Sequence, residues 1–301
     1  MFDLRKYKFA PQLNVMIVFP NAKINIGLNI VSKRNDGFHN IETVFYPVRY
    51  DDILEVIEVE DDTVEVKKKT KKEIAIKPVN FLQTGIKIPG IPEDNICVKA
   101  YRLLEVDYEL PLIDVYLQKI IPTGAGLGGG SSDGAYMLRV LNDLFNIGLK
   151  TDKFINYAQK LGSDCPFFLH NKPVYANGKG NQFDEIKLDL SDLFIVLITP
   201  PIHISTVEAY TKITPSVPGY SLKDIIKQPI ENWKKKIKND FEPKTFRKFP
   251  LLNSIKKDLY TKGALYASMS GSGSTIYGIF SKKQNWKVSD FKGCKVHWAA
   301  L

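Results

Sequence analysis

A regular alternation of apolar and polar residues predicts strands in both halves of the chain. Between Lys23 and Ile30 every second residue is isoleucine or leucine, and the residues between them are polar or glycine. This period of two is typical of a strand with one buried face and one polar face. Further strands are predicted at residues 42–49, 53–60, 113–121, 193–199, 266–268 and 275–280. Pro166 favours extended backbone at Cys165, so a strand is also predicted over 167–169.

Apolar residues that recur every three or four positions predict the helices. The pattern covers residues 94–106, 132–147, 151–161 and 206–212, and residues 220–260 are predicted to be mainly helical. We expect the Asp-Asn pair at 94–95 to cap the first helix. Ser131 or Ser132 is expected to cap the second, with Asp133 in its first turn. Helices and strands intermix in both halves, which favours an α+β protein with two lobes.

The most informative segment is a run with five glycines between a predicted strand and a predicted helix. It reads Pro-Thr-Gly-Ala-Gly-Leu-Gly-Gly-Gly-Ser-Ser over residues 122–132. Glycine tolerates positive φ and lets backbone N–H groups approach a ligand closely, and the N-terminus of a helix attracts anions. We interpret the segment as a phosphate-binding loop. A surface turn or flexible linker is the alternative, and the strongly periodic helix that follows at once argues against it.

This loop differs from the common nucleotide-binding motifs. Residues 124–129 formally match G-x-G-x-x-G, but no second strand ending in an acidic residue follows, as a dinucleotide-binding fold requires. A P-loop would carry Gly-Lys-Ser or Gly-Lys-Thr, and the next lysine here is Lys150. The positive charge that binds phosphate must therefore come from elsewhere in the chain. Lys23 is the leading candidate, although a lysine on the polar face of a strand is more often a surface residue.

Composition indicates an ordinary globular protein. The chain has 301 residues, of which 44% are hydrophobic and 25% are charged. Its longest purely apolar run, residues 193–198, is far shorter than the roughly 20 residues that span a bilayer. The first residues, 1–20, lack the apolar core of a signal peptide. We therefore expect a cytoplasmic protein with no membrane partner.

Cysteines and histidines indicate neither a disulfide framework nor a metal site made by the protein alone. The three cysteines, at 97, 165 and 294, are odd in number and far apart. The four histidines show none of the i, i+4 pairing of a helical metal site. Any metal is therefore expected to arrive with a nucleotide.

The net charge of +9 makes a nucleic-acid-binding protein a rival hypothesis. Lysines cluster at 67–72 and 234–236. The first cluster lies between strand-like segments, which predicts a hairpin turn, and the second belongs to a lysine-rich helical face. Charge runs by themselves carry no base readout, so a solvated surface is the preferred interpretation and no nucleic-acid partner is expected.

Three motifs, in order over most of the chain, resemble those of the GHMP kinases. They are Pro-Asn-Ala-Lys-Ile-Asn at 20–25, the glycine loop at 122–132 and Met-Ser-Gly-Ser-Gly-Ser at 269–274. The resemblance implies a two-lobed α+β fold with the active site in the cleft between the lobes. Residues 1–172 would form an N-terminal, ribosomal-protein-like α/β lobe that binds ATP, and residues 173–301 a C-terminal α+β sandwich lobe that binds substrate. Family members usually begin near Met16, which is therefore an expected alternative initiator.

Two further motifs resemble one branch of this family. Asp-Gly-Phe-His-Asn-Ile-Glu-Thr at 36–43 and Leu-Gly-Ser-Asp-Cys-Pro-Phe-Phe at 161–168 resemble the kinases that phosphorylate a cytidine-diphosphate-linked sugar alcohol in isoprenoid precursor biosynthesis. Phe38 stands where that branch usually has tyrosine, which keeps a stacking ring and loses a hydroxyl. Gly134 stands where alanine is usual. A family member acting on homoserine or mevalonate is the alternative, and an NAD-dependent oxidoreductase is a second rival class that the missing strand disfavours.

The resemblance also implies a role for each motif residue. Asp164, which in isolation would be interpreted as a turn residue, would accept the proton of the substrate's 2-hydroxyl. Lys23 would stabilise the ionised Asp164 and polarise that hydroxyl. ATP is the expected phosphoryl donor and Mg²⁺ the expected cofactor, and the enzyme is expected to be a monomer or homodimer.

The expected binding residues form two sets. The ATP-binding set is Pro122, Thr123, Gly124, Ala125, Gly126, Leu127, Gly128, Gly129, Gly130, Ser131, Ser132 and Asn95. The substrate-binding set is Asn25, Phe38, His39, Thr206 and Tyr210. The cytosine would lie between the rings of Phe38 and Tyr210, with His39 hydrogen-bonding its edge.

Overall fold

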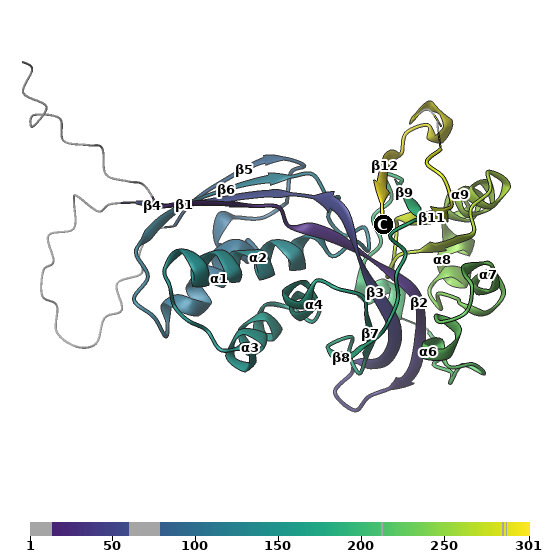
Figure 1. The fold of residues 1–301 in the computed structure, drawn as a ribbon, viewed down its shortest axis with the longest axis horizontal. Helices are drawn as coiled ribbons and strands as arrows, with labels where there is room; N and C mark the ends of the chain where they lie inside the picture. Colours follow the sequence, from purple (N-terminus) through teal and green to yellow (C-terminus); the bar gives the residue numbers. More distant parts are fainter. Residues whose placement is uncertain (1–13, 60–78, 212, 285, 287) are drawn as a thin grey trace, which may run out of the picture.

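Two long antiparallel strands, β2 (Asn21–Lys33) and β3 (His39–Asp51), lie between the two lobes of the chain (Figure 1). This computed structural model describes residues 14–59, 79–211, 213–284, 286 and 288–301. The lysine-rich hairpin predicted at 67–72 lies outside the described residues, as do the residues before 14. The predicted α+β architecture with two lobes is confirmed.

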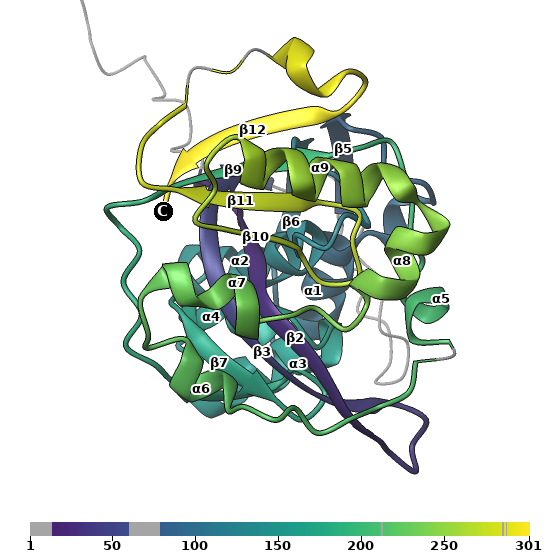
Figure 2. The ribbon, with the colours of Figure 1, turned by 90° about the vertical axis from the view of Figure 1, so that its right-hand side faces the viewer.

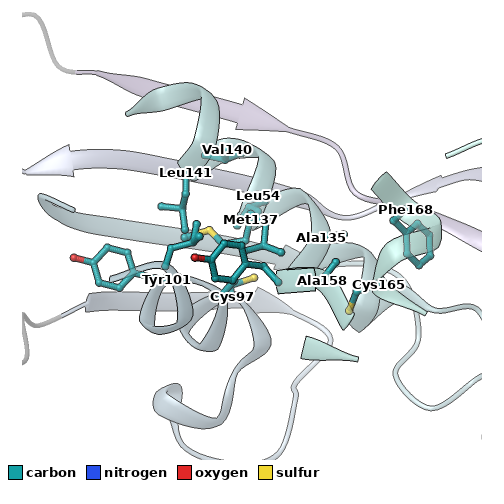
Figure 3. Packing of buried hydrophobic residues seen from close by; sticks show 14 of the residues in the cluster. Leu54, Cys97, Tyr101, Ala135, Met137, Val140, Leu141, Ala158, Cys165 and Phe168 are labelled. Atoms are coloured by element: carbon teal, nitrogen blue, oxygen red, sulfur yellow. The ribbon is translucent and has the colours of Figure 1, made fainter. Parts of the chain in front are cut away.

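The first sheet forms one layer of the N-terminal lobe. Its strands, in spatial order, are β1 (Val15–Val18), β4 (Ile53–Val59), β6 (Leu112–Lys119) and β5 (Val79–Gly85). Strand β5 runs parallel to β6, and the other neighbours are antiparallel. Helices α1 (Ile96–Glu105) and α2 (Gly129–Leu144) pack against one face, and Figure 3 shows the apolar side chains buried there. As predicted, the side chain of Asn95 caps α1 by accepting a hydrogen bond from Cys97 N.

The second sheet has the order β2, β3, β7 (Val174–Asn177) and β8 (Gln182–Glu185). The polar face predicted for β2 is buried in this structure, so the alternative that Lys23 is a surface residue is wrong. Lys23 and Asn25 are only 4% and 3% exposed. The glycine loop covers them from one side, since a Cβ on Gly128 would lie 3.1 Å from the Lys23 side chain, and Ser270 of the other lobe accepts a hydrogen bond from Asn25 N. The polar face of this strand therefore points into the interior, where each side chain requires a partner.

The third sheet belongs to the C-terminal lobe (Figure 2). Its antiparallel strands, in spatial order, are β10 (Tyr266–Met269), β11 (Ile276–Phe280), β9 (Phe194–Thr199) and β12 (Lys295–Ala300). Helix α9 (Pro250–Thr261) packs on β10 and β11 through Leu252, Ile255 and Leu259. The strands predicted at 193–199, 266–268 and 275–280 are confirmed apart from their ends.

The remaining helices are mostly short. The helices predicted over 151–161 and 206–212 are α3 (Thr151–Leu161) and α5 (Thr206–Tyr210). The mainly helical stretch predicted at 220–260 contains, before α9, the helices α6 (Leu222–Ile225), α7 (Trp233–Lys236) and α8 (Glu242–Lys248).

Two predictions next to the glycine loop are wrong. Helix α2 begins at Gly129, with Gly128 at its N-cap in the left-handed region, so neither Ser131 nor Ser132 caps it and Asp133 lies beyond its first turn. The strand predicted over 167–169 is instead the helix α4 (Cys165–His170). Pro166 lies in the first turn of α4, where its missing N–H has no helical partner to lose, and this overrides the extended preference of the preceding residue.

The glycine loop of the N-terminal lobe packs directly against residues 270–274 of the C-terminal lobe. Ser270 Oγ donates a hydrogen bond to Gly126 O at 2.7 Å and accepts one from Asn25 N at 3.2 Å. A Cβ atom on Gly126 would lie 2.0 Å from Ser270 O. Since Gly126 also has a φ of 79°, the contact between the lobes requires glycine here for two independent reasons.

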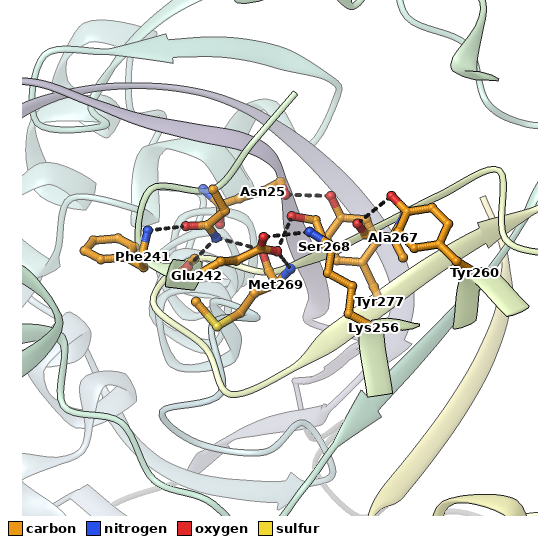
Figure 4. A network of polar contacts seen from close by, with 11 residues as sticks. Asn25, Phe241, Glu242, Lys256, Tyr260, Ala267, Ser268, Met269 and Tyr277 are labelled. Atoms are coloured by element: carbon orange, nitrogen blue, oxygen red, sulfur yellow. Dashed lines mark hydrogen bonds and ion pairs between the residues drawn. The ribbon is translucent and has the colours of Figure 1, made fainter. Parts of the chain in front are cut away.

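A buried polar network supports residues 270–274 from behind (Figure 4). Glu242 Oε1 accepts a hydrogen bond from Met269 N at 2.9 Å, and Asn239 Nδ2 donates to Met269 O at 2.8 Å. Asp240, which follows Asn239, accepts a hydrogen bond from Ile30 N in β2 at 2.7 Å. Residues 239–242 therefore connect the central strand of the molecule to the second loop.

We predict that Gly126→Ala destabilises the protein. The added Cβ meets a backbone oxygen and forces a non-glycine residue into the left-handed region, which together cost at least about 2 kcal/mol in the free energy of unfolding. Gly130→Ala is the matched control, because a Cβ there meets nothing within 4 Å and φ is not positive. Denaturant unfolding of both variants measures the difference, and equal stability of the two would contradict the packing described.

Candidate active site

A cavity of about 770 Å³ opens between the two lobes. All but three of the predicted site residues line it. From the predicted ATP-binding set these are Pro122, Thr123, Gly124, Ala125, Gly126, Gly128, Gly129, Gly130 and Ser131. From the other sets they are Lys23, Asp164, Asn25, Phe38, His39, Thr206 and Tyr210. Residues separated by more than a hundred positions in sequence are thus brought to one place.

Lys23 and Asp164 form an ion pair in this cavity. The Nζ atom of Lys23 lies 3.4 Å from Asp164 Oδ2 and donates a hydrogen bond to Asn25 Oδ1 at 2.6 Å. The Lys23 side chain is almost fully buried, whereas that of Asp164 is 31% exposed. Burial lowers the pKa of Lys23 below its ordinary value, and the charge of Asp164 opposes part of this shift. The pair therefore places a desolvated ammonium group beside a carboxylate that an incoming ligand can reach.

The local fold explains how the pair forms. Strand β2 holds Lys23, whose backbone N–H donates to Leu127 O of the glycine loop at 2.9 Å. Asp164 immediately precedes helix α4. Asn25, which accepts from Lys23, in turn donates to Thr43 Oγ1 at 3.0 Å on β3. This chain of buried hydrogen bonds fixes the direction of the lysine side chain.

The glycine loop presents backbone N–H groups to the cavity. Gly124, Gly126 and Gly128 all have φ between 68° and 79°, a conformation that glycine adopts without strain. Among the described residues, no backbone N–H group from Gly124 to Ser131 donates a hydrogen bond to another part of the protein. The loop also runs into the N-terminus of the sixteen-residue helix α2. Free amides and a helix N-terminus together form a site suited to phosphate oxygens.

Aromatic side chains lie at the other end of the cavity. The rings of His39 and Tyr210 stack with centroids 5.0 Å apart. Phe38 is 59% exposed, and the ammonium group of Lys179 lies 4.8 Å from the centroid of its ring. One face of Tyr210 is thus covered by His39, while Phe38 remains largely free to stack on a ligand. The role of these residues in binding cytosine stays a prediction.

Three predicted residues lie outside the cavity lining. Leu127 is buried in the apolar core, and Ser132 is fully buried on α2 with no hydrogen-bond partner for its Oγ. Asn95 uses its side-chain oxygen to cap α1. Their assignment to the ATP site stays a prediction, and none of them lines the cavity of this structure.

Several lining residues were missed by sequence reasoning about the site. Gly271 and Ser272 belong to the third glycine-containing motif, and Ser272 Oγ lies 3.4 Å from Thr206 Oγ1. Their motif was recognised in the sequence as one of the three family motifs, and this signal could have placed both residues in the site. Lys33 and Lys179 also line the cavity, and no sequence pattern distinguishes them from other surface lysines.

Two family models match the chain. The model described as GHMP kinases N terminal domain matches residues 95–172, and the one described as GHMP kinases C terminal matches residues 221–287. A 4-diphosphocytidyl-2-C-methyl-D-erythritol kinase from Bacteroides fragilis is 48% identical over 277 residues, which cover 92% of this chain and 96% of that protein. The chain belongs to the GHMP kinases. Within this family it groups with the 4-diphosphocytidyl-2-C-methyl-D-erythritol kinases.

Further relatives of this GHMP kinase agree. The 4-diphosphocytidyl-2-C-methyl-D-erythritol kinase of Parabacteroides distasonis is 46% identical over 280 residues, or 93% of this chain and 97% of that one. A crystal structure of 4-(cytidine 5'-diphospho)-2C-methyl-D-erythritol kinase superposes with a TM-score of 0.72 at 28% identity, covering 87% and 89% of the two chains. A homoserine kinase from Cytophaga hutchinsonii shares the fold with a TM-score of 0.63 at 15% identity, covering 98% of each.

Membership of the GHMP kinases favours a small-molecule kinase over an oxidoreductase or a nucleic-acid-binding protein. Within the described ranges, no helix is long and apolar enough to cross a membrane. No group of three or more histidine, cysteine, aspartate or glutamate side chains is arranged there to hold a metal ion.

We predict that Asp164→Asn lowers the pKa of Lys23 further. The carboxylate raises that pKa against the effect of burial, so removing its charge leaves burial unopposed. A titration of ¹³C-labelled lysine followed by NMR measures the change. Asp184→Asn is the control, since Asp184 pairs with the distant, exposed Lys223. An unchanged or raised Lys23 pKa in the Asp164 variant would show that the pair does not form in solution.

Proposed function

We propose that this GHMP kinase transfers the γ-phosphoryl group of ATP to the 2-hydroxyl of 4-diphosphocytidyl-2-C-methyl-D-erythritol, a step in isoprenoid precursor biosynthesis. The observation that carries the proposal is the Lys23–Asp164 pair, which lies in one cavity with the glycine loop and with the aromatic residues Phe38 and His39. The names of the close relatives support this substrate over homoserine or mevalonate.

Each part of the cavity has a chemical task in this proposal. The free N–H groups of the glycine loop bind the phosphates of ATP, with the N-terminus of α2 adding partial positive charge. Asp164 accepts the proton of the substrate hydroxyl as the oxygen attacks the γ-phosphorus. Lys23 stabilises the ionised Asp164 and the charge that develops on the transferred group. The burial of Lys23 strengthens both interactions, because few water molecules screen its charge.

Mg²⁺ belongs to the same proposal and arrives with ATP. Within the described part of the cavity, Asp164 is the one carboxylate, and Ser131 adds a hydroxyl beside the loop. Oxygen ligands of this kind suit Mg²⁺, which binds proteins through one or two carboxylates together with substrate phosphates. When bound, the ion neutralises charge on the phosphate oxygens. We also propose a cytoplasmic location. Three further statements stay predictions: that the protein is a monomer or homodimer, that the lobes divide between residues 172 and 173, and that it has no nucleic-acid partner.

We expect Asp164→Asn to lower the rate of phosphoryl transfer by about 10²–10⁴, because it removes the proton acceptor. Lys23→Met should lose activity on a similar scale. The measurement is ADP release with Mg·ATP and 4-diphosphocytidyl-2-C-methyl-D-erythritol, and Asp184→Asn is the control. Robust activity in either site variant would refute the assigned roles. Equal turnover of homoserine or mevalonate by the unmodified enzyme would refute the substrate and spare the kinase class.

We expect Phe38→Ala to raise the KM for the cytidine substrate and to leave the KM for ATP unchanged. Stacking of a base on an aromatic ring contributes about 1–3 kcal/mol, which corresponds to a rise in KM of roughly 5- to 150-fold. Phe38→Tyr restores a ring of the same size and should retain the KM of the unmodified enzyme. If the KM for the cytidine substrate stays the same in the alanine variant, Phe38 does not stack on the base.

A further inference from the structure

A buried ionic cluster lies directly beneath the glycine loop. It consists of Asp52, Lys119 and Asp133, whose side chains are all at most 1% exposed. Lys119 Nζ bonds to Asp52 Oδ2 and lies 2.8 Å from Asp133 Oδ2. None of the three lines the cavity, so the proposed mechanism makes no direct use of them. Charged groups buried this deeply are costly and are retained when they fix a structure or serve a function.

Asp52 fixes the backbone of the two residues that precede the glycine loop. Its Oδ1 accepts hydrogen bonds from Ile120 N at 2.5 Å and from Ile121 N at 2.9 Å. Two residues before it, Tyr50 donates its hydroxyl to Ile120 O at 3.1 Å. The end of β3 and the residue that follows it thus bind the C=O and the N–H of Ile120, the second residue before the loop begins at Pro122.

Lys119 and Asp133 hold the end of the loop. Lys119 closes strand β6, and Asp133 lies on α2, so their ion pair joins the strand before the loop to the helix after it. The ammonium group of Lys119 also packs under the first residue of α2, because a Cβ on Gly129 would lie 2.9 Å from Lys119 Nζ. Both ends of the loop are therefore attached to one cluster of charges.

The three charged groups of the cluster shift one another's pKa values. Burial raises the pKa of Asp133 to about 8, although Lys119 opposes this shift. The two carboxylates in turn raise the pKa of Lys119 against the effect of its burial. Lys119 is therefore held in its charged form between Asp52 and Asp133. Asp52 and Asp133 thus neutralise the charge of Lys119, which does not act on a phosphate directly.

We propose that Tyr50 and the buried ionic cluster are positioning residues that set the affinity of the glycine loop for ATP phosphates. The inference rests on the proposed function only in that the loop binds a nucleotide. The loop's N–H groups can bind phosphate oxygens without prior ordering if both ends of the loop are already fixed, which lowers the cost of binding. If either end of the loop is loosened, part of the binding free energy is used to order the loop, and the affinity for nucleotide falls.

The test is calorimetric titration of the full chain with the non-hydrolysable analogue AMP-PNP in the presence of Mg²⁺. We expect Asp52→Asn to weaken binding about tenfold or more, since it removes one of the two carboxylate charges that Lys119 faces. Tyr50→Phe, which removes one hydroxyl, should weaken it about threefold and serves in its place if Asp52→Asn does not fold. Steady-state kinetics should show a matching rise in the KM for ATP and no rise in the KM for the acceptor, a split that a general loss of folded enzyme does not produce.

Tyr101→Phe is the matched control. It removes a buried hydroxyl that donates to Pro111 O at 2.8 Å in the same lobe, away from the loop, and should leave AMP-PNP affinity unchanged. Affinity within twofold of the unmodified protein in both Asp52→Asn and Tyr50→Phe would overturn the proposal, and so would an equal loss in Tyr101→Phe. Because AMP-PNP binding needs no acceptor, tight binding without activity on the cytidine substrate would refute the proposed function, while the affinities of the three variants would still decide this inference.

Discussion

The close contact between the two glycine loops is the constraint on which the rest of the site depends. Gly126 and Ser270 come from different lobes, and no side chain fits between them. Ser270 reaches past the loop to Asn25 N, so one hydroxyl connects the first loop, the second loop and strand β2. With these three segments joined, the polar face of β2 is enclosed, and the cavity forms beside it.

That enclosure changes the character of Lys23. On an open strand its ammonium group would be hydrated and interchangeable with many surface lysines. Here its charge is nearly desolvated and is stabilised by Asp164 and Asn25. Burial is costly for such a group, so its retention is explained best by a ligand that also uses the charge. Lys119 differs from Lys23, because two carboxylates neutralise its charge and its role is structural.

Local signals in the sequence were sufficient for the strands at 193–199 and 275–280 and for the helix α3, because apolar periodicity acts over a few residues. These local signals failed where contacts between residues far apart in sequence determine the structure. Lys23 is covered by residues more than a hundred positions later, since a Cβ on Gly128 would lie 3.1 Å from its side chain, and the helix at Cys165–His170 overrides a local extended preference. The pairing of Lys23 with Asp164 came from family resemblance, since spacing alone cannot bring such residues together. Lys179 and the buried ionic cluster carry no motif and required the structure.

The central claim is that phosphate donor, acceptor hydroxyl and the Lys23–Asp164 pair meet in the cavity between the lobes. A crystal structure of the enzyme with AMP-PNP, Mg²⁺ and 4-diphosphocytidyl-2-C-methyl-D-erythritol tests it most directly. The account predicts the analogue's phosphates on the N–H groups of the glycine loop and the substrate's 2-hydroxyl within about 3 Å of Asp164 and in line with the γ-phosphorus. A substrate bound with that hydroxyl away from Asp164, or phosphates bound elsewhere than the loop, would contradict it.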